Sequence, residues 1–266
     1  MWFERWLTEG YSVRQLSVQS GYSCSKLYRI IHTWLRHEPE LETRSLESCR
    51  YLLFDGSFLR YPETIVALMD AQERTVIAGE HGVRERSQTD LLAFLVPLRE
   101  RGLYPVSCTI DGLSVVDRTF RLVWPEIVIQ RCLVHIQRQG LSWCRMHPKR
   151  KDAEQLRRFF VRVPWIDNEQ QRDQFLADLK DWEEHYGHDI ASRPGRGKVF
   201  SDLKRARSLL CKALPNMFQY LNDPNIPKST NGLEGYFSRL KKSYRAHNGL
   251  TETKNYCHWY FATKPK

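Results

Sequence analysis

The sequence of 266 residues lacks any apolar run that approaches the ~18 residues of a membrane span. Its start also lacks the apolar segment of a signal peptide, because Glu4 and Arg5 interrupt the hydrophobic residues there. The seven cysteines are an odd number spread along the chain, which does not fit a disulfide framework and indicates a reducing compartment. These absences argue against a membrane-spanning or disulfide-stapled protein and predict a cytoplasmic one.

Acidic residues are in the minority. The 41 Lys and Arg residues outnumber the 31 Asp and Glu residues and give a formal net charge of +10. This balance favours a polyanionic partner, although a merely basic enzyme would share it. The hydrophobic fraction of 41% is that of a soluble globular protein, and the length fits one or two domains.

Residues 1–37 predict a helix-turn-helix. A first helix starts at about Ser12, Gly21 makes the turn, and a second helix follows. The residues of the second helix that are expected to face inward are Leu27, Ile30 and Ile31. The residues left facing outward are Ser23, Ser25, Lys26, Tyr28 and Arg29. Of these, we expect Ser25, Lys26 and Arg29 to contact DNA. A plain helical hairpin gives the same spacing, so that alternative stays open.

A mixed α/β sheet is predicted after a polar linker at residues 38–49. The apolar runs that predict strands are 51–61, 64–71, 74–80, 106–111 and 126–130. The first three follow one another, and helices at 88–101, at 115–123 and from Arg131 alternate with the last two. We therefore expect residues 50–139 to form the first part of an α/β core.

The strand signal is missing from residues 140–227, where helical periodicity replaces it. A stretch of this length is too long for a loop, so it predicts an all-α insertion. We expect Trp143, Trp165 and Trp182 in the core of the insertion; the alternative is that one of them stacks on an unpaired base. Residues 228–266 would then complete the α/β core.

Three carboxylates stand out. Asp55 and Asp111 each follow an apolar strand and precede a glycine. An Asp-Gly hairpin turn is the alternative, and it fits Asp55 better because a helix follows Asp111. Glu234 begins a helix with a stripe of apolar residues, and the alternative role there is a capping box, Asn231-x-x-Glu234.

Three carboxylates from separate elements can hold two Mg²⁺ ions about 4 Å apart for phosphodiester chemistry. Their hard oxygen atoms suit Mg²⁺. We therefore predict Asp55, Asp111 and Glu234 as catalytic metal ligands. The cations that follow Glu234 on the same helix would hold the DNA backbone at this site: Lys241, Lys242 and Arg245.

Four motifs occur in an order that is typical of a known family. They are FDGS at Asp55, TIDG at Asp111, QRCLVHIQR with Cys132 and His135, and STNGLEGYFSRLKKSYRAHNGL with Glu234. With these motifs, and with the final ETKNYCHWYF, the chain resembles bacterial insertion-sequence transposases of the Mutator-like DDE group over nearly its whole length. The resemblance implies an RNase H-like mixed sheet with an all-α insertion, preceded here by the helix-turn-helix.

The same resemblance implies a DNA transposase that cleaves double-stranded element ends and transfers the strand to target DNA by attack of a 3′-hydroxyl. It implies two Mg²⁺ ions, for which Mn²⁺ can substitute, a homo-oligomer on DNA, and a His135 that approaches the active site or the DNA. The alternatives are an inactive remnant that binds DNA as a repressor, and an RNase H-like nuclease or resolvase.

Two cysteine patterns bear on whether the chain binds zinc. Relatives often begin with paired C-x-x-C motifs, which this sequence lacks, so we expect a truncated or divergent copy. Cys132-x-x-His135 and Cys144-x-x-His147 offer four ligands and leave a zinc site as an alternative. A small buried Cys132 is the role that we favour.

Overall fold

The computed structural model describes residues 1–39, 45–192, 198–247 and 249–263, so part of the predicted linker 38–49 lies outside the described residues. The chain forms two compact units. The first comprises Met1–Val106, Leu113–Ile127 and Asn231–Lys266, and the second comprises Ser107–Gly112 and Val128–Thr230. The chain therefore crosses between the units several times.

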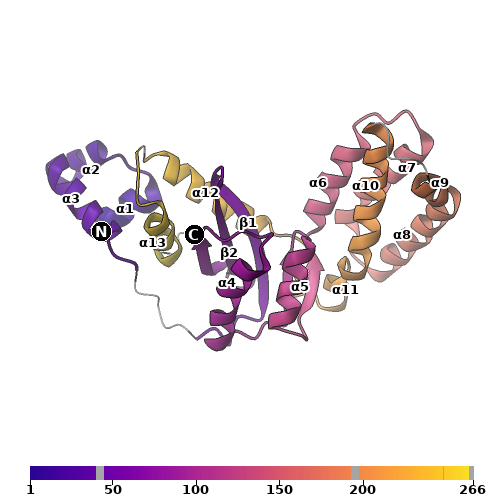
Figure 1. Cartoon of the computed structure of the whole chain (residues 1–266), viewed down its shortest axis with the longest axis horizontal. Coiled ribbons are helices and arrows are strands. Elements are labelled where there is room, and N and C mark those ends of the chain that lie inside the picture. The colour runs from indigo at the N-terminus through magenta and orange to yellow at the C-terminus, as the bar shows by residue number, and fades with distance from the viewer. Residues whose placement is uncertain (40–44, 193–197, 248, 264–266) are drawn as a thin grey trace. The chain divides into compact units, whose positions relative to one another are not determined.

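The first unit holds helices from both ends of the chain. Its elements are α1 (Trp2–Glu9), α2 (Val13–Ser20), α3 (Cys24–Leu35), β1 (Tyr51–Arg60), β2 (Glu63–Asp70), β3 (Thr75–His81), α4 (Gln88–Glu100), α5 (Ser114–Val123), α12 (Asn231–Arg245) and α13 (Thr253–Thr263). Figure 1 labels most of them and marks both chain ends.

The second unit holds two short strands and otherwise helices among its described residues. Its elements are β4 (Ser107–Ile110), β5 (Val128–Arg131), α6 (Leu133–Cys144), α7 (Lys151–Arg162), the 3₁₀ turn η1 (Val163–Trp165), α8 (Glu169–Trp182), the π-helical turn η2 (Glu183–Gly187), α9 (His188–Ser192), α10 (Lys198–Ala213), η3 (Leu214–Asn216) and α11 (Gln219–Asn222).

The five strands have the order β3-β2-β1-β4-β5. Strands β1, β2 and β3 pair in antiparallel fashion, whereas β4 and β5 are parallel. The mixed α/β sheet expected from the sequence is therefore confirmed.

A different helix packs on each face of strand β1, because successive side chains of a strand point in opposite directions. Leu53 belongs to the hydrophobic core that includes Leu233 and Phe237 of α12. Its neighbour Phe54 points the other way, and its ring meets that of Phe120 on α5 with centroids 5.2 Å apart. The sheet of the first unit is thus covered by α12 on one face and α5 on the other.

Capping residues and a glycine in the local sequence fix where the N-terminal helices begin and end. Ser12 and Gln15 form a capping box at the start of α2, and Gly21 ends that helix with φ 72°, a left-handed conformation that favours glycine. Ser23 then caps α3. Leu27 and Ile31 are buried as predicted, whereas Ile30 is half-buried.

Helices α1 to α3 share their hydrophobic core with α12 and α13. The Tyr256 hydroxyl donates a hydrogen bond of 3.0 Å to the carbonyl of Leu7, and the Trp259 indole donates one of 3.0 Å to that of Trp34. Asn255 similarly donates to the Leu35 carbonyl at 2.7 Å. The two ends of the chain therefore form one packed body.

The described part of residues 140–227 contains helices joined by turns and loops and no strand, and α6 runs through residue 140. Trp182 is buried as predicted, and its indole donates to the carbonyl of Asp152 at 3.1 Å. Trp143 is half-buried, whereas Trp165 is 72% exposed. The predicted core position of Trp165 is therefore wrong, because η1 turns that side chain away from the helices.

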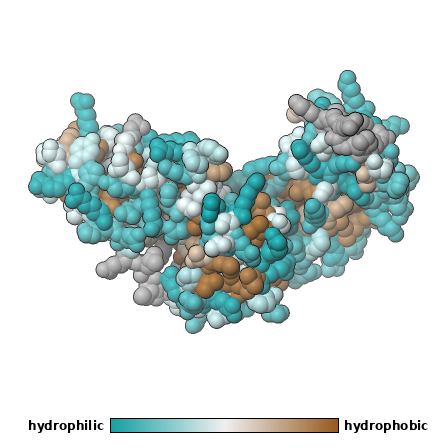
Figure 2. Space-filling model, in the orientation of Figure 1, coloured by the Kyte–Doolittle hydropathy of each residue, from teal (hydrophilic) through white to brown (hydrophobic). Residues whose placement is uncertain are grey.

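Hydrophilic side chains cover most of the face seen in Figure 2. Apolar side chains gather over α4 and α5, the helices that carry the exposed residues Val96 and Leu122. Among the described residues, no helix combines the length and apolar character needed to span a membrane.

Gly140 allows a close helix contact in the second unit. A Cβ atom there would lie 2.1 Å from the Phe160 ring. We predict that Gly140→Ala destabilises the protein by about 1–3 kcal/mol through overpacking, even though alanine is the better helix former. Gly235→Ala on α12 is the matched control, because its Cβ would meet only Arg239 at an ordinary 3.6 Å. Thermal unfolding of both variants tests this; a Gly140→Ala protein as stable as wild type contradicts it.

Candidate functional site

Asp55 lies in the middle of β1 and is only 7% exposed. It pairs with Ala67 of β2, and the next pair in the register is Gly56 with Val66. The strand continues to Arg60, so the hairpin turn considered for Asp55-Gly56 is wrong. The Gly56 amide donates a hydrogen bond of 2.9 Å to the Asp55 carboxylate.

Gly232 brings α12 close to the sheet. A Cβ atom at this position would lie 3.1 Å from Sδ of Met69 and 3.3 Å from Cδ1 of Leu53, which is tighter than ordinary packing. The missing side chain helps the first turn of α12 to approach β1 and β2 this closely, since a Cβ atom would force Met69 and Leu53 to shift. The sequence offered a signal for this contact, a glycine two residues before the acid, that we did not use.

Glu234 lies in the first turn of α12, where the positive end of the helix dipole favours a carboxylate. Helix α12 begins at Asn231, within one residue of the position that the alternative capping box Asn231-x-x-Glu234 requires, so that alternative stays open. The predicted apolar stripe is confirmed, since Leu233, Phe237, Leu240 and Tyr244 are buried.

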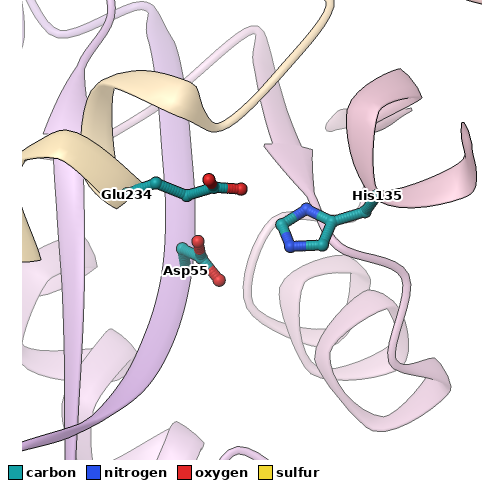
Figure 3. Close-up of side chains that lie close together, drawn as sticks. All are labelled: Asp55, His135 and Glu234. Atoms are coloured by element: carbon teal, nitrogen blue, oxygen red, sulfur yellow. The ribbon is translucent and has the colours of Figure 1, made fainter. Parts of the chain in front are cut away.

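The two carboxylates of the first unit meet at this place. An oxygen of Asp55 and an oxygen of Glu234 lie within 4.8 Å of each other. Figure 3 shows both side chains reaching to the same side, one from β1 and one from α12; it also draws His135, which belongs to the second unit. Two negative charges at this separation repel, so their pairing favours a bound cation.

Lys241 lies two turns beyond Glu234 on α12. Its ammonium donates a hydrogen bond to the Ser57 hydroxyl on β1, and the side chain is half-buried. The pKa of Lys241 is lowered, mainly by burial and also by the charge of Arg245, while the charge of Asp55 acts in the opposite direction. Lys241 is therefore packed within the electrostatic reach of Asp55, which we did not predict from the sequence.

The other two cations of this helix differ from Lys241. Lys242 and Arg245 are exposed on α12. Their positive charge faces solvent in the last turns of the helix whose first turn carries Glu234. This arrangement can attract a polyanion toward the carboxylates.

Asp111 follows β4 directly and belongs to the second unit. Gly112 comes next with φ 101°, and helix α5 begins at Ser114. No strand follows at hairpin distance, so the Asp-Gly hairpin alternative is also wrong here. The Arg131 guanidinium donates to the backbone carbonyl of Asp111 at 3.2 Å.

Cys132, His135 and Thr230 form a small polar cluster in the second unit. The Thr230 amide donates to the Cys132 sulfur at 3.4 Å, and the Thr230 hydroxyl lies 3.4 Å from Nδ1 of His135. Burial raises the pKa of the Cys132 thiol, but hydrogen bonds from His135 and Thr230 outweigh that effect and lower the pKa overall. Cys132 is fully buried, as expected, and His135 is half-buried.

The zinc alternative does not fit α6. His135 and Cys144 lie in this one helix, nine residues apart, which corresponds to a rise of about 13 Å. Ligands of one zinc ion must all lie about 2.0–2.3 Å from it.

The predicted DNA-contacting residues of α3 are exposed. Ser25, Lys26 and Arg29 lie on the side of the helix opposite the buried Leu27 and Ile31. The Lys26 ammonium sits 3.7 Å from the centroid of the Tyr22 ring. These side chains are therefore available to a ligand, and their contact with DNA stays a prediction.

Comparisons with known proteins place the chain in a family. A family model described as "Transposase, Mutator family" matches residues 12–248. The matched segment contains Asp55, Asp111 and Glu234. A search of curated proteins gave no match.

The Asp55–Glu234 pair predicts a measurable effect of metal on stability. When a chelator keeps the protein free of metal, Glu234→Gln should raise the melting temperature by a few degrees, because the substitution removes the repulsion between the two carboxylates. Added Mg²⁺ should raise the melting temperature of the wild type by mass action, and much less that of the variant. Glu73→Gln, at an exposed acid of the same unit, is the charge-matched control. An equal response to Mg²⁺ in wild type and Glu234→Gln contradicts metal binding by this pair.

Proposed function

Because the chain belongs to the Mutator family of transposases, we propose that it cuts DNA at the ends of a bacterial insertion sequence and joins the freed 3′-hydroxyl to target DNA. Membership of a transposase family implies a DNA substrate. The observation that carries the proposed chemistry is the pairing of Asp55 and Glu234 within 4.8 Å. A buried acid beside a second acid is costly unless it serves a cation.

Asp111 is the proposed third acid. The order of the strands supports this assignment, since β4 follows β1 in the sheet, β1 carries Asp55, and Asp111 comes directly after β4. The strand order, with three antiparallel strands followed by two parallel ones, also supports an RNase H-like core. Helices α7 to α11 lie within the proposed all-α insertion at residues 140–227.

The three carboxylates offer hard oxygen ligands, which fit Mg²⁺ and also Mn²⁺. When bound, Mg²⁺ supplies Lewis-acid catalysis at the attacking and leaving oxygens of the phosphodiester. Lys242 and Arg245 would hold the DNA backbone, and Lys241 would add positive charge close to Asp55. His135 would approach the substrate from the second unit.

Helices α2 and α3 are the proposed helix-turn-helix. The turn at Gly21 and the exposed Ser25, Lys26 and Arg29 support a role of α3 in the major groove. A homo-oligomer on DNA completes the proposal, because two element ends must be brought together before strand transfer.

The cleavage test uses a labelled duplex that carries the inverted repeats flanking the gene. We predict that Glu234→Gln, Asp55→Asn and Asp111→Asn each fold and bind this duplex but cut it orders of magnitude more slowly, because each loses a charge that holds Mg²⁺. Cutting by the wild type should stop when the metal is chelated. A variant that cuts at the wild-type rate removes that acid from the site, and a wild type that binds without cutting supports the repressor alternative.

A separate experiment tests the recognition of DNA by α3. Lys26→Ala with Arg29→Ala should weaken binding to the same duplex and reduce the salt slope by about 2, one for each lost phosphate contact. Titrations at several salt concentrations measure this slope. Arg14→Ala, an exposed cation on α2, is the matched control. Unchanged binding by the double variant would remove α3 from the DNA interface.

A further inference from the structure

The tip of the β1–β2 hairpin carries two exposed aromatic side chains. Phe58 is 51% exposed and Tyr61 is 84% exposed. Their ring centroids lie 5.5 Å apart with an interplanar angle of 49°. Large aromatic side chains are seldom left this open to water, and here two of them stand together.

The hairpin tip lies at the end of the strand that carries Asp55, and Phe58 points to the face of that strand opposite Asp55. Helix α12 runs beside β1 in the same direction, since Gly232 meets Leu53, Glu234 lies near Asp55, and Lys241 donates to Ser57. Further along, Tyr244 of α12 is close enough to Arg60 to help raise its pKa, after the larger effect of Glu63. The strand therefore leads from the acids to the aromatic tip alongside the basic half of α12.

The charges around the tip favour a nucleic acid over an apolar protein surface. Arg60 is exposed at the tip, and Lys242 and Arg245 are exposed on the neighbouring helix. The acid at the turn, Glu63, forms an ion pair of 3.1 Å with Arg60. Aromatic rings among cations are the combination that binds bases by stacking while the cations hold the phosphates.

We propose that Phe58 and Tyr61 form a base-stacking contact for an unpaired or unstacked base of the DNA substrate. This inference rests on the proposed function, because it assigns a base to DNA held at the acids. From Asp55 to Arg60, its last residue, the strand rises five residues, or about 17 Å, which equals about five nucleotides of B-form DNA. The contact thus lies to one side of the cleavage position.

A binding experiment with full-length protein isolates the bases from the phosphates. The probes are a labelled twelve-nucleotide oligo(dT) and an abasic strand of the same length, which keeps the phosphates and lacks the bases. Wild type should bind oligo(dT) about tenfold more tightly, and Phe58→Ala with Tyr61→Ala should lose that preference while keeping its affinity for the abasic strand.

Two further variants separate stacking from mere apolar contact. Phe58→Tyr with Tyr61→Phe keeps both rings and should keep the preference, whereas Phe58→Leu with Tyr61→Leu keeps apolar volume and should lose it. Tyr104→Ala removes a tyrosine that is 60% exposed elsewhere in the first unit and should change nothing. Equal melting temperatures establish that each variant is folded.

The outcomes are distinct. Equal binding of both probes by wild type, or a preference retained by the leucine variant, overturns base stacking but leaves phosphate binding and the acids of the proposed function intact. A change of oligomeric state in the alanine variant, with its preference for oligo(dT) unchanged, would identify the tip as a contact between copies of the chain and overturn the inference. Failure of wild type to bind either probe would also overturn the inference, whereas the proposed function is tested separately by binding and cutting of the duplex.

Discussion

The close approach of α12 to β1 is the constraint on which the candidate site depends. Gly232 lets the first turn of the helix reach Leu53 and Met69, and this contact holds Glu234 beside Asp55. Two carboxylates brought together in a partly buried place cost free energy. The packing that opposes this cost is the hydrophobic core beneath α12, to which Leu233 and Phe237 contribute. The paired carboxylates therefore lower the stability of the fold locally, and the surrounding hydrophobic core must offset that cost.

That core extends into the N-terminal helices. The carbonyl of Leu7 on α1 accepts hydrogen bonds from Ser243 of α12 and from Tyr256 of α13. The Trp6 carbonyl likewise lies 2.8 Å from Nε2 of His247, just after α12. The helix that carries Glu234 and the helices proposed to read DNA are thus parts of one packed body. DNA bound to α3 would consequently be held at a fixed distance from Glu234.

Features set by local sequence could be predicted, and features set by distant partners could not. The spacing of Leu233 and Phe237 predicted the buried face of α12 because periodicity alone defines it. The hairpin at Asp55 could not be dismissed from the sequence, because only the pairing of β1 with β2 shows that the strand continues. Trp165 was placed wrongly for a related reason: an apolar residue is buried only where another element covers it.

The cations of α12 show that contact with the neighbouring sheet determines which of their side chains are buried. Lys241 and Lys242 are adjacent in the sequence, yet Lys241 is half-buried on Ser57 while Lys242 faces water. Seven residues separate Glu234 from Lys241, close to two helical turns, so both side chains lie toward β1. The ammonium therefore offsets part of the negative charge of Asp55 and Glu234, and a divalent cation added to this group would make its net charge positive. A phosphodiester, which carries one negative charge, would be attracted to the two acids more strongly in that state, so cation binding and placement of the phosphodiester at the acids would favour each other.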